Sequence, residues 1–258
     1  MILVLAGTSD ARELAVRLRA EGYPVLATVV TDSAAQSLAE AGLAARVGRL
    51  TAEQLAELAA EIGATAGVDA THPFAEEASR NAMAAAKRTG LPYVRFERER
   101  QTFSDRPGLV WADDYERAAE LAAERRGVVM LTTGSKTLPI FARRLLGLPD
   151  TTLIARMLPR KDNMEKCEEL GIEQKNIVAM QGPFSKELNA ALYRHYGVTL
   201  MITKESGKVG AVGEKLEAAL ELGIECIVIG RPQIEYGSVH EDAEGVLAEL
   251  RRQTRGEG

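Results

Sequence analysis

The sequence has few of the residues that usually build metal centres, disulfide frameworks or nucleophilic catalytic sites. Only two cysteines and three histidines occur among 258 residues, and neither a C-x-x-C pair nor a histidine cluster accompanies them. A G-x-S-x-G elbow, a Ser-His-Asp arrangement and a Walker phosphate loop are missing as well. We therefore predict no metal site and no protein nucleophile, so that chemistry would come from a bound cofactor.

Long apolar runs and an excess of positive charge are also missing. No apolar stretch reaches the roughly 18–20 residues of a membrane span, and the N-terminus has no basic segment or cleavage site typical of a signal peptide. The net charge of -5 argues against a general nucleic-acid binder, which is usually basic. We expect a cytoplasmic protein without membrane or nucleic-acid partners, and the sequence leaves its oligomeric state open.

Short apolar runs alternate with amphipathic helical patterns along the whole chain. Apolar strands without polar alternation, each followed by a helix, are typical of a parallel sheet that helices cover on both faces. We predict an α/β fold with a helix over residues 74–88 and a last helix over 243–253. Pro73 suits the N1 position at the start of the first of these helices. The expected strands are residues 1–6, 24–30, 44–47, 66–71, 92–96, 127–133, 151–157, 176–180, 199–204 and 225–230.

About ten strands suit two five-stranded sheets better than one open sheet of ten. The polar segment 97–107, ERERQTFSDRP, ends in a proline and is the expected boundary. It divides the chain into domains of residues 1–107 and 108–258. The strand-like residues 108–111 could belong to either sheet.

The turn after the first strand, GTSD at residues 7–10, lacks the G-x-G-x-x-G pattern of dinucleotide-binding loops. It either holds a phosphate with its glycine and hydroxyl groups or only connects a strand to a helix. Asp10 and Glu13 have the spacing of a capping box, which predicts Asp10 as the N-cap of the next helix. A coenzyme would then lie against Thr8 and Ser9 rather than on the helix end.

Other polar residues of the first half leave two further questions open. Asp32 follows the second strand, where the adenosine ribose is usually bound, and favours NAD. Its hydroxyl neighbours Thr31 and Ser33, together with Arg12, favour the additional phosphate of NADP. His72 is either a structural hydrogen-bonding residue or an acid or base.

Parallel sheets bind ligands beyond the carboxyl ends of their strands. Nearly every expected strand ends in glycine, proline or small hydroxyl residues, which are common in turns but also offer hydrogen bonds to an anion. In the second half, cations accompany these residues. They are Lys136, Arg156, Arg160, Lys204 and Arg231. Their accumulation on one sheet edge predicts a polyanionic ligand there.

Nine motifs in series resemble the precorrin-6A reductase family of cobalamin biosynthesis, which includes the cobalt-precorrin-6A reductases. They are GTSDAR, DATHPFA, SRNA, LPYVRFER, LTTGSK, RMLPR, QGPFSKELN, TKESG and VIGRPQ, from residue 7 to residue 232. The resemblance implies two Rossmann-like domains with mostly parallel sheets, and terminal strands exchanged between the sheets. It also implies that NADPH binds the first domain and a tetrapyrrole the second.

The resemblance assigns site residues motif by motif. The residues implied to face the coenzyme are Gly7, Thr8, Ser9, Arg12, Thr31, Asp69, Thr71 and His72. The residues implied to line the macrocycle cleft are Thr133, Gly134, Ser135, Lys136, Arg156, Gly182, Pro183, Phe184, Ser185, Lys204, Glu205, Ser206, Gly207 and Arg231. The cations among them suit the acetate and propionate carboxylates of a precorrin.

The implied reaction is the transfer of a hydride from NADPH to one carbon of a conjugated double bond, with protonation of the neighbouring carbon. Lys136, His72 and Lys204 are candidate proton donors, besides a bound water or a substrate carboxyl group. Metal-free and cobalt-containing macrocycles present the same carboxylates, so both substrates are open.

Two other functions are open on the residues alone. A small-molecule methyltransferase also has a glycine turn after its first strand, although that loop is usually richer in glycine. A nucleotide-sensing module without catalysis needs a coenzyme site but no second basic cleft. The cations of the second half therefore argue against the sensing module.

Overall fold

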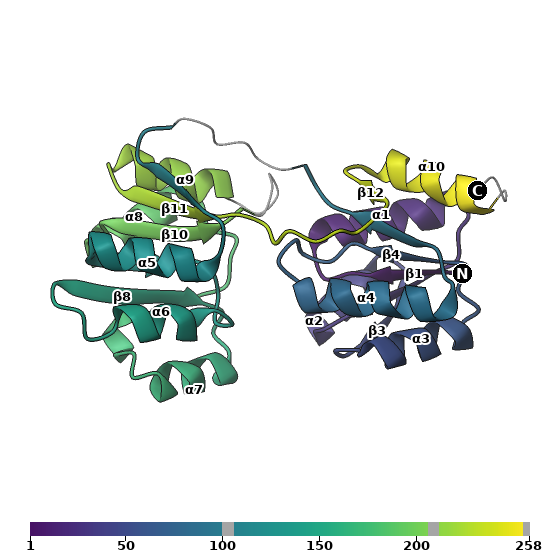
Figure 1. The fold of residues 1–258 in the computed structure, drawn as a ribbon, viewed down its shortest axis with the longest axis horizontal. Helices are drawn as coiled ribbons and strands as arrows, with labels where there is room; N and C mark the ends of the chain where they lie inside the picture. Colours follow the sequence, from purple (N-terminus) through teal and green to yellow (C-terminus); the bar gives the residue numbers. More distant parts are fainter. Residues whose placement is uncertain (100–105, 206–211, 255–258) are drawn as a thin grey trace. The chain divides into compact units, whose positions relative to one another are not determined.

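The computed structural model describes residues 1–99, 106–205 and 212–254. The chain forms two compact units, Met1–Glu99 with Gln233–Gly258 and Arg100–Pro232 (Figure 1). Each unit has one six-stranded sheet whose neighbouring strands are all parallel. The predicted α/β class with parallel sheets is therefore confirmed.

The sheet of the first unit has the strand order β12-β5-β4-β1-β2-β3. Its strands are β1 (Ile2–Leu5), β2 (Val25–Val29), β3 (Ala44–Val47), β4 (Ala66–Asp69), β5 (Tyr93–Phe96) and β12 (Val239–His240). Its helices are α1 (Ser9–Ala20), α2 (Asp32–Glu40), α3 (Ala52–Glu61), α4 (Glu76–Thr89) and α10 (Ala243–Thr254).

Both faces of this sheet are buried, as the continuous apolar strands require. Successive side chains of a strand point to opposite faces. Ile2 and Val4 of β1 therefore lie in one core cluster, which includes residues of α1 and α10. Leu3 and Leu5 lie in a second cluster with residues of α3 and α4. The turns that follow the carboxyl ends of the strands are where a sheet of this kind carries a site.

The sheet of the second unit has the order β6-β11-β10-β7-β8-β9. Its strands are β6 (Leu109–Ala112), β7 (Gly127–Leu131), β8 (Thr151–Met157), β9 (Ile177–Ala179), β10 (Leu200–Lys204) and β11 (Glu225–Ile229). Its helices are α5 (Tyr115–Arg125), α6 (Leu138–Leu145), α7 (Lys161–Glu169), α8 (Lys186–Tyr196) and α9 (Val212–Glu221), with a 3₁₀ turn at Gln174–Asn176. No helix within the described ranges has the length and hydropathy that crossing a membrane demands.

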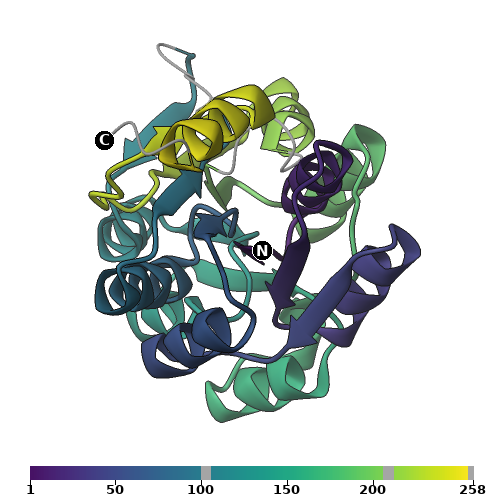
Figure 2. The same ribbon diagram turned by 90° about the vertical axis from the view of Figure 1, so that its right-hand side faces the viewer.

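The C-terminal segment departs from the predicted domain division. Residues 233–258 belong to the first unit and not to the second, where β12 pairs with β5 and α10 packs against α1 and β5 (Figures 1 and 2). Val246 and Leu250 of α10 are fully buried there. The two residues of β12 are too few to show a strand pattern. The sequence therefore did not predict that the C-terminal segment pairs with the first sheet. The C-terminal strand thus joins the first sheet, while β6 joins the second.

Helix α4 begins later than predicted. The carbonyl of His72 accepts a hydrogen bond from the N–H of Ala75, and the N–H of Phe74 donates to Nδ1 of the same histidine. This turn uses the groups that would otherwise start the helix, so α4 begins at Glu76. The prediction of a helical start at Pro73 is therefore wrong, whereas the last helix ends within one residue of its predicted bound.

Candidate functional site

A cavity of about 330 Å³ lies at the carboxyl ends of β1 and β2 in the first unit. Its volume falls in the range of small-molecule sites, and its position is the one where open α/β sheets bind ligands. The predicted coenzyme residues that line it are Gly7, Thr8, Ser9, Arg12 and Thr31. The cavity is completed by Ala6, Val29, Ser33, Ala34, Ser37 and Leu38.

The turn that forms this cavity depends on Gly7, whose φ is +141° and is rarely adopted by other residues. Thr8 follows with an extended backbone, and its hydroxyl oxygen accepts a hydrogen bond from the N–H of Ala11 at 3.2 Å. Thr8 is therefore the N-cap of α1, and the prediction of Asp10 as N-cap is wrong. The Oδ2 atom of Asp10 instead lies 2.7 Å from Nε of Arg98, which compensates the carboxylate charge.

Hydroxyl groups and one cation dominate the far side of the cavity. The Nη1 atom of Arg12 donates to Oγ of Ser37 at 2.7 Å, and Ser33 lies one helical turn before Ser37 on the same face of α2. Thr31 caps α2 by accepting from the N–H of Ala34 at 3.3 Å. Asp32 is exposed and does not line the cavity, which is therefore free of carboxylates.

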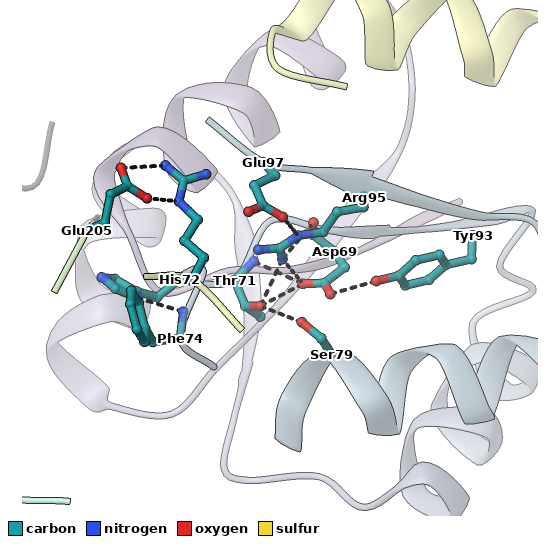
Figure 3. Close-up of polar contacts among 10 residues, drawn as sticks. Asp69, Thr71, His72, Phe74, Ser79, Tyr93, Arg95, Glu97 and Glu205 are labelled. Carbon is teal, nitrogen blue, oxygen red and sulfur yellow. Dashed lines mark hydrogen bonds and ion pairs between the residues drawn. The ribbon is translucent and has the colours of Figure 1, made fainter. Parts of the chain in front are cut away.

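Asp69 lies in a buried ion-pair network at the end of β4 (Figure 3). Its Oδ1 accepts from Nη1 of Arg95 at 2.9 Å and from the hydroxyl of Thr71 at 2.7 Å, and its Oδ2 accepts from the hydroxyl of Tyr93 at 2.7 Å. The side chains of Asp69 and Arg95 are both 0% exposed. Burial and the neighbouring Asp69 raise the pKa of Tyr93, which stays protonated. Asp69 thus holds the ends of β4 and β5 together and does not line the cavity.

Thr71 and His72 follow Asp69 beyond the sheet. Thr71 is buried. It lines a small hollow together with Thr8, which lies in the turn after β1. His72 is half-buried, and its Nδ1 accepts from the N–H of Phe74 at 3.2 Å. An accepting Nδ1 belongs to a neutral ring whose Nε2 carries the proton. Thr71, unlike His72, therefore shares a hollow with Thr8.

Arg156 and Arg231 are both buried, and both were predicted to bind the substrate in the second unit. Arg156 is the next-to-last residue of β8, and its Nη1 donates to Oδ1 of Asn189 at 2.7 Å. Its guanidinium lies 4.4 Å from the ring centroid of Phe184, so two predicted cleft residues are in contact. Burial lowers the pKa of Arg156. Within the described residues it makes no ion pair, because its partners are an amide and an aromatic ring.

Three lysines extend this positive charge. Burial and the charge of Lys136 lower the pKa of Lys204, at the end of β10, to about 8. Burial and the charges of Arg156 and Lys204 lower the pKa of Lys215, on α9, to about 8. Desolvation and nearby like charges both disfavour a protonated amine. The second unit therefore gathers cations whose mutual repulsion a bound polyanion would relieve.

Arg231 differs from Arg156 in having a carboxylate partner. Its guanidinium forms a two-point ion pair with Glu205, the side chains being 1% exposed. Both residues were predicted to line the macrocycle cleft, but the charge of Arg231 is already compensated within the protein. Arg156 has no such carboxylate partner among the described residues.

The other predicted cleft residues follow the ends of β7 and β9. Thr133 is buried and its hydroxyl accepts from Thr137 at 3.2 Å, and Ser185 caps α8 by accepting from the N–H of Leu188. Gly134, Ser135, Gly182 and Pro183 lie in the same two loops. Ser206 and Gly207 lie outside the described residues.

The geometry of both units can now be compared with known proteins. Residues 1–251 match the family described as precorrin-6x reductase CbiJ/CobK. The chain belongs to this family. As a precorrin-6x reductase family member, it is 58% identical over 255 residues to the cobalt-precorrin-6A reductase of Priestia megaterium, with 99% of this chain and 100% of that one covered.

More distant relatives agree with this membership of the precorrin-6x reductase family. The cobalt-precorrin-6A reductase of Salmonella typhimurium is 37% identical and covers 90% of this chain and 87% of its own. The solved structure of the precorrin-6A reductase CobK matches with a TM-score of 0.79 at 28% identity, over 98% of this chain and 96% of that one. The predicted family and the two-domain fold are confirmed.

Several site residues of this precorrin-6x reductase family member escaped prediction. Ser37 lies within α2, yet its place one turn after Ser33 was a usable signal. Lys215 lies one turn before the fully buried Ala219 on α9, and a lysine on a buried stripe is unusual. Arg95 had no such signal, since its partner Asp69 is 26 residues away.

Proposed function

We propose that this protein reduces one double bond of cobalt-precorrin-6A with NADPH in cobalamin biosynthesis. Membership of the precorrin-6x reductase family supports the reaction. Relatives named cobalt-precorrin-6A reductases share 29–58% identity with this chain, and those named precorrin-6A reductases share 29–32%. Of these relatives, those above 32% identity all carry the cobalt name, which favours the cobalt-containing macrocycle. The metal-free macrocycle is the second candidate.

The carboxylate-free cavity of the first unit carries the coenzyme assignment. When bound, the reduced nicotinamide supplies a hydride. Gly7 lets the backbone turn closely around a diphosphate, and Thr8 and Thr31 keep their hydroxyl hydrogens to donate, since their capping role uses only the oxygens. Arg12, Ser33 and Ser37 suit the 2′-phosphate, because a guanidinium forms charge-assisted hydrogen bonds with phosphate. This set favours NADPH over NADH.

The cations of the second unit are the proposed substrate site. Arg156 presents a buried guanidinium without a carboxylate partner among the described residues, and Lys215 adds a further charge close to both Arg156 and Lys204. Tetrapyrrole acetates and propionates would complete these interactions. Lys136, which is exposed, can reach the same ligand from the loop after β7.

Lys204, Lys136 and His72 are the proposed proton donors. Lys204 leads, because its pKa of about 8 lies nearer to neutrality than that of an ordinary lysine, and acids matched to the working pH are the most effective. Replacing the donor by alanine should lower kcat and leave the KM for NADPH unchanged. Wild-type kcat in all three alanine variants would exclude them and favour water.

The direct test of the function is turnover by the purified full-length chain. Cobalt-precorrin-6A and precorrin-6A are incubated separately with NADPH or NADH, and coenzyme oxidation is followed with the absorbance of the macrocycle. We expect oxidation of one NADPH per macrocycle, faster with the cobalt form and slower with NADH. Coenzyme oxidation that is independent of the macrocycle, or no turnover of either substrate, would contradict the proposal.

Arg156→Met should raise the KM for the tetrapyrrole about tenfold and leave the KM for NADPH unchanged, because a charge-assisted hydrogen bond contributes about 1.5–3 kcal/mol. The matched control is Arg143→Met on α6 of the same unit, since Arg143 is exposed and already paired with Glu116. Steady-state kinetics with each substrate varied in turn measure both constants. An unchanged tetrapyrrole KM in Arg156→Met would exclude this role.

A further inference from the structure

Helix α8 connects two cations of the second unit that lie on different elements. Asn189 and Tyr193 are four residues apart and so lie on one face of α8. Asn189 accepts a hydrogen bond from Nη1 of Arg156 at 2.7 Å, and the hydroxyl of Tyr193 donates to the backbone carbonyl of Lys215 at 3.3 Å. Both α8 residues are buried, so this face positions Arg156 and Lys215 together.

Lys215 has no carboxylate partner within the described residues, although α9 is rich in glutamate. Glu217 and Glu221 both approach Nζ of Lys186. At 100° per residue they lie about 200–240° around the helix from Lys215. These two carboxylates therefore occupy a different face of α9 from Lys215, which lies near the charges of Arg156 on β8 and Lys204 on β10.

Such an arrangement is unfavourable for the protein alone. Arg156 and Lys215 meet in a partly desolvated place, where their like charges repel, and neither pairs with an acidic residue in the described part of the chain. Tyr193, which faces them from α8, stays neutral because burial raises the pKa of its hydroxyl. A site of this kind is complete only with an anion, and a carboxylate is the group that the proposed substrate offers.

We infer that Lys215 is a substrate-binding residue that, with Arg156, clamps one side-chain carboxylate of the tetrapyrrole. This inference rests on the proposed function and adds α9 to the elements that bind the macrocycle. The clamp needs the protonated amine. Since the pKa of Lys215 is about 8, tetrapyrrole affinity should fall as the pH rises through 8. The pKa of Lys204 is also about 8, so the loss of its proton should contribute to the same fall in affinity.

The test measures tetrapyrrole binding without turnover. Cobalt-precorrin-6A is titrated into the full-length protein without NADPH, and Kd is obtained from the absorbance of the macrocycle between pH 6.5 and pH 9.5. The variants are Lys215→Met, Lys215→Arg and, as matched control, Lys161→Met, whose lysine is 90% exposed. The Kd for NADPH is measured in parallel because its proposed site lies in the other unit.

We expect Lys215→Met to raise the tetrapyrrole Kd about tenfold at pH 7, with Lys161→Met and the NADPH Kd unchanged. Lys215→Arg should stay within about threefold of wild type at pH 7 and show a weaker pH dependence, because arginine remains charged throughout. Lys215→Met should also keep or raise the Tm, since it removes an uncompensated, half-buried charge.

Two results would overturn the inference, and they differ in meaning. A wild-type Kd and pH dependence in Lys215→Met, with wild-type protein that binds and reduces the macrocycle, would exclude the clamp alone. Wild-type protein that binds NADPH but no tetrapyrrole would overturn the clamp together with the proposed function.

Discussion

Asp69→Ala is expected to lower the free energy of unfolding of the first unit by about 3–5 kcal/mol, because it leaves the guanidinium of Arg95 buried without its carboxylate. Arg95 is 0% exposed, and its other described acidic partner, Glu97, is 3.5 Å away. The hydroxyls of Thr71 and Tyr93 lose their acceptor as well. Few single substitutions in this chain remove so many buried interactions.

Urea denaturation followed by two probes measures this effect. The single tryptophan of the chain, Trp111, lies on β6 of the second unit, so its fluorescence reports that unit, while far-UV circular dichroism reports both. We expect Asp69→Ala to move an early circular-dichroism transition to lower urea and to leave the tryptophan transition in place. The matched control is Asp162→Ala, whose exposed ion pair with Arg160 should contribute less than about 1 kcal/mol.

A double substitution separates the loss of a carboxylate from the loss of volume. Asp69→Leu combined with Arg95→Met removes both charges, and it should be less destabilising than Asp69→Ala alone, because no unpaired ion is left in the core. Equal stability of the single variant Asp69→Ala and the wild type would show that the network contributes nothing. The double variant also tests whether charge or packing holds the ends of β4 and β5.

Arg12→Ala is expected to raise the KM for NADPH about 100-fold and to leave the KM for NADH near its wild-type value. The guanidinium of Arg12 is oriented by Ser37 at 2.7 Å, so its remaining N–H groups are available to a phosphate. A charge-assisted hydrogen bond to phosphate contributes about 1.5–3 kcal/mol, which corresponds to a factor of about 10–150 and includes this value. NADH lacks the phosphate and loses nothing.

The control for this prediction lies on the same helix. Arg17 of α1 is half-exposed and pairs with Glu21 and Glu244, so Arg17→Ala should leave both coenzyme constants unchanged. Steady-state rates with NADPH and NADH at a fixed tetrapyrrole concentration give the ratio of kcat/KM for the two coenzymes. An equal rise of both KM values in Arg12→Ala would refute recognition of the 2′-phosphate.

Only some features of the turn after β1 could be predicted from the sequence. Gly7 and the hydroxyls beside it stand between a strand and a helix, and the structure places them at the cavity. The cap could not be chosen reliably, because Thr8 and Asp10 are both good N-cap residues and a distant partner decided between them. Arg98 pairs with Asp10, which leaves Thr8 to cap α1.

The substrate edge shows the same division. The sequence placed Arg156, Lys204 and Arg231 at or just after the carboxyl ends of strands, and they lie there in the structure. It did not show that Glu205 neutralises Arg231, since that pairing depends on side-chain geometry across 26 residues. Lys215 was overlooked because it lies within helix α9 and not at a strand end.

The sequence by itself determined the parallel α/β architecture, the polar strand ends and the family, because these depend on local periodicity and on motifs in a fixed order. Tertiary structure alone decided that β12 and α10 return to the first unit, that Asp69 binds Arg95, and that α8 brings Lys215 and Arg156 together. Each of these depends on contacts between residues that are distant in the chain. Such contacts leave no periodic pattern in the sequence, because they form only when the chain has folded.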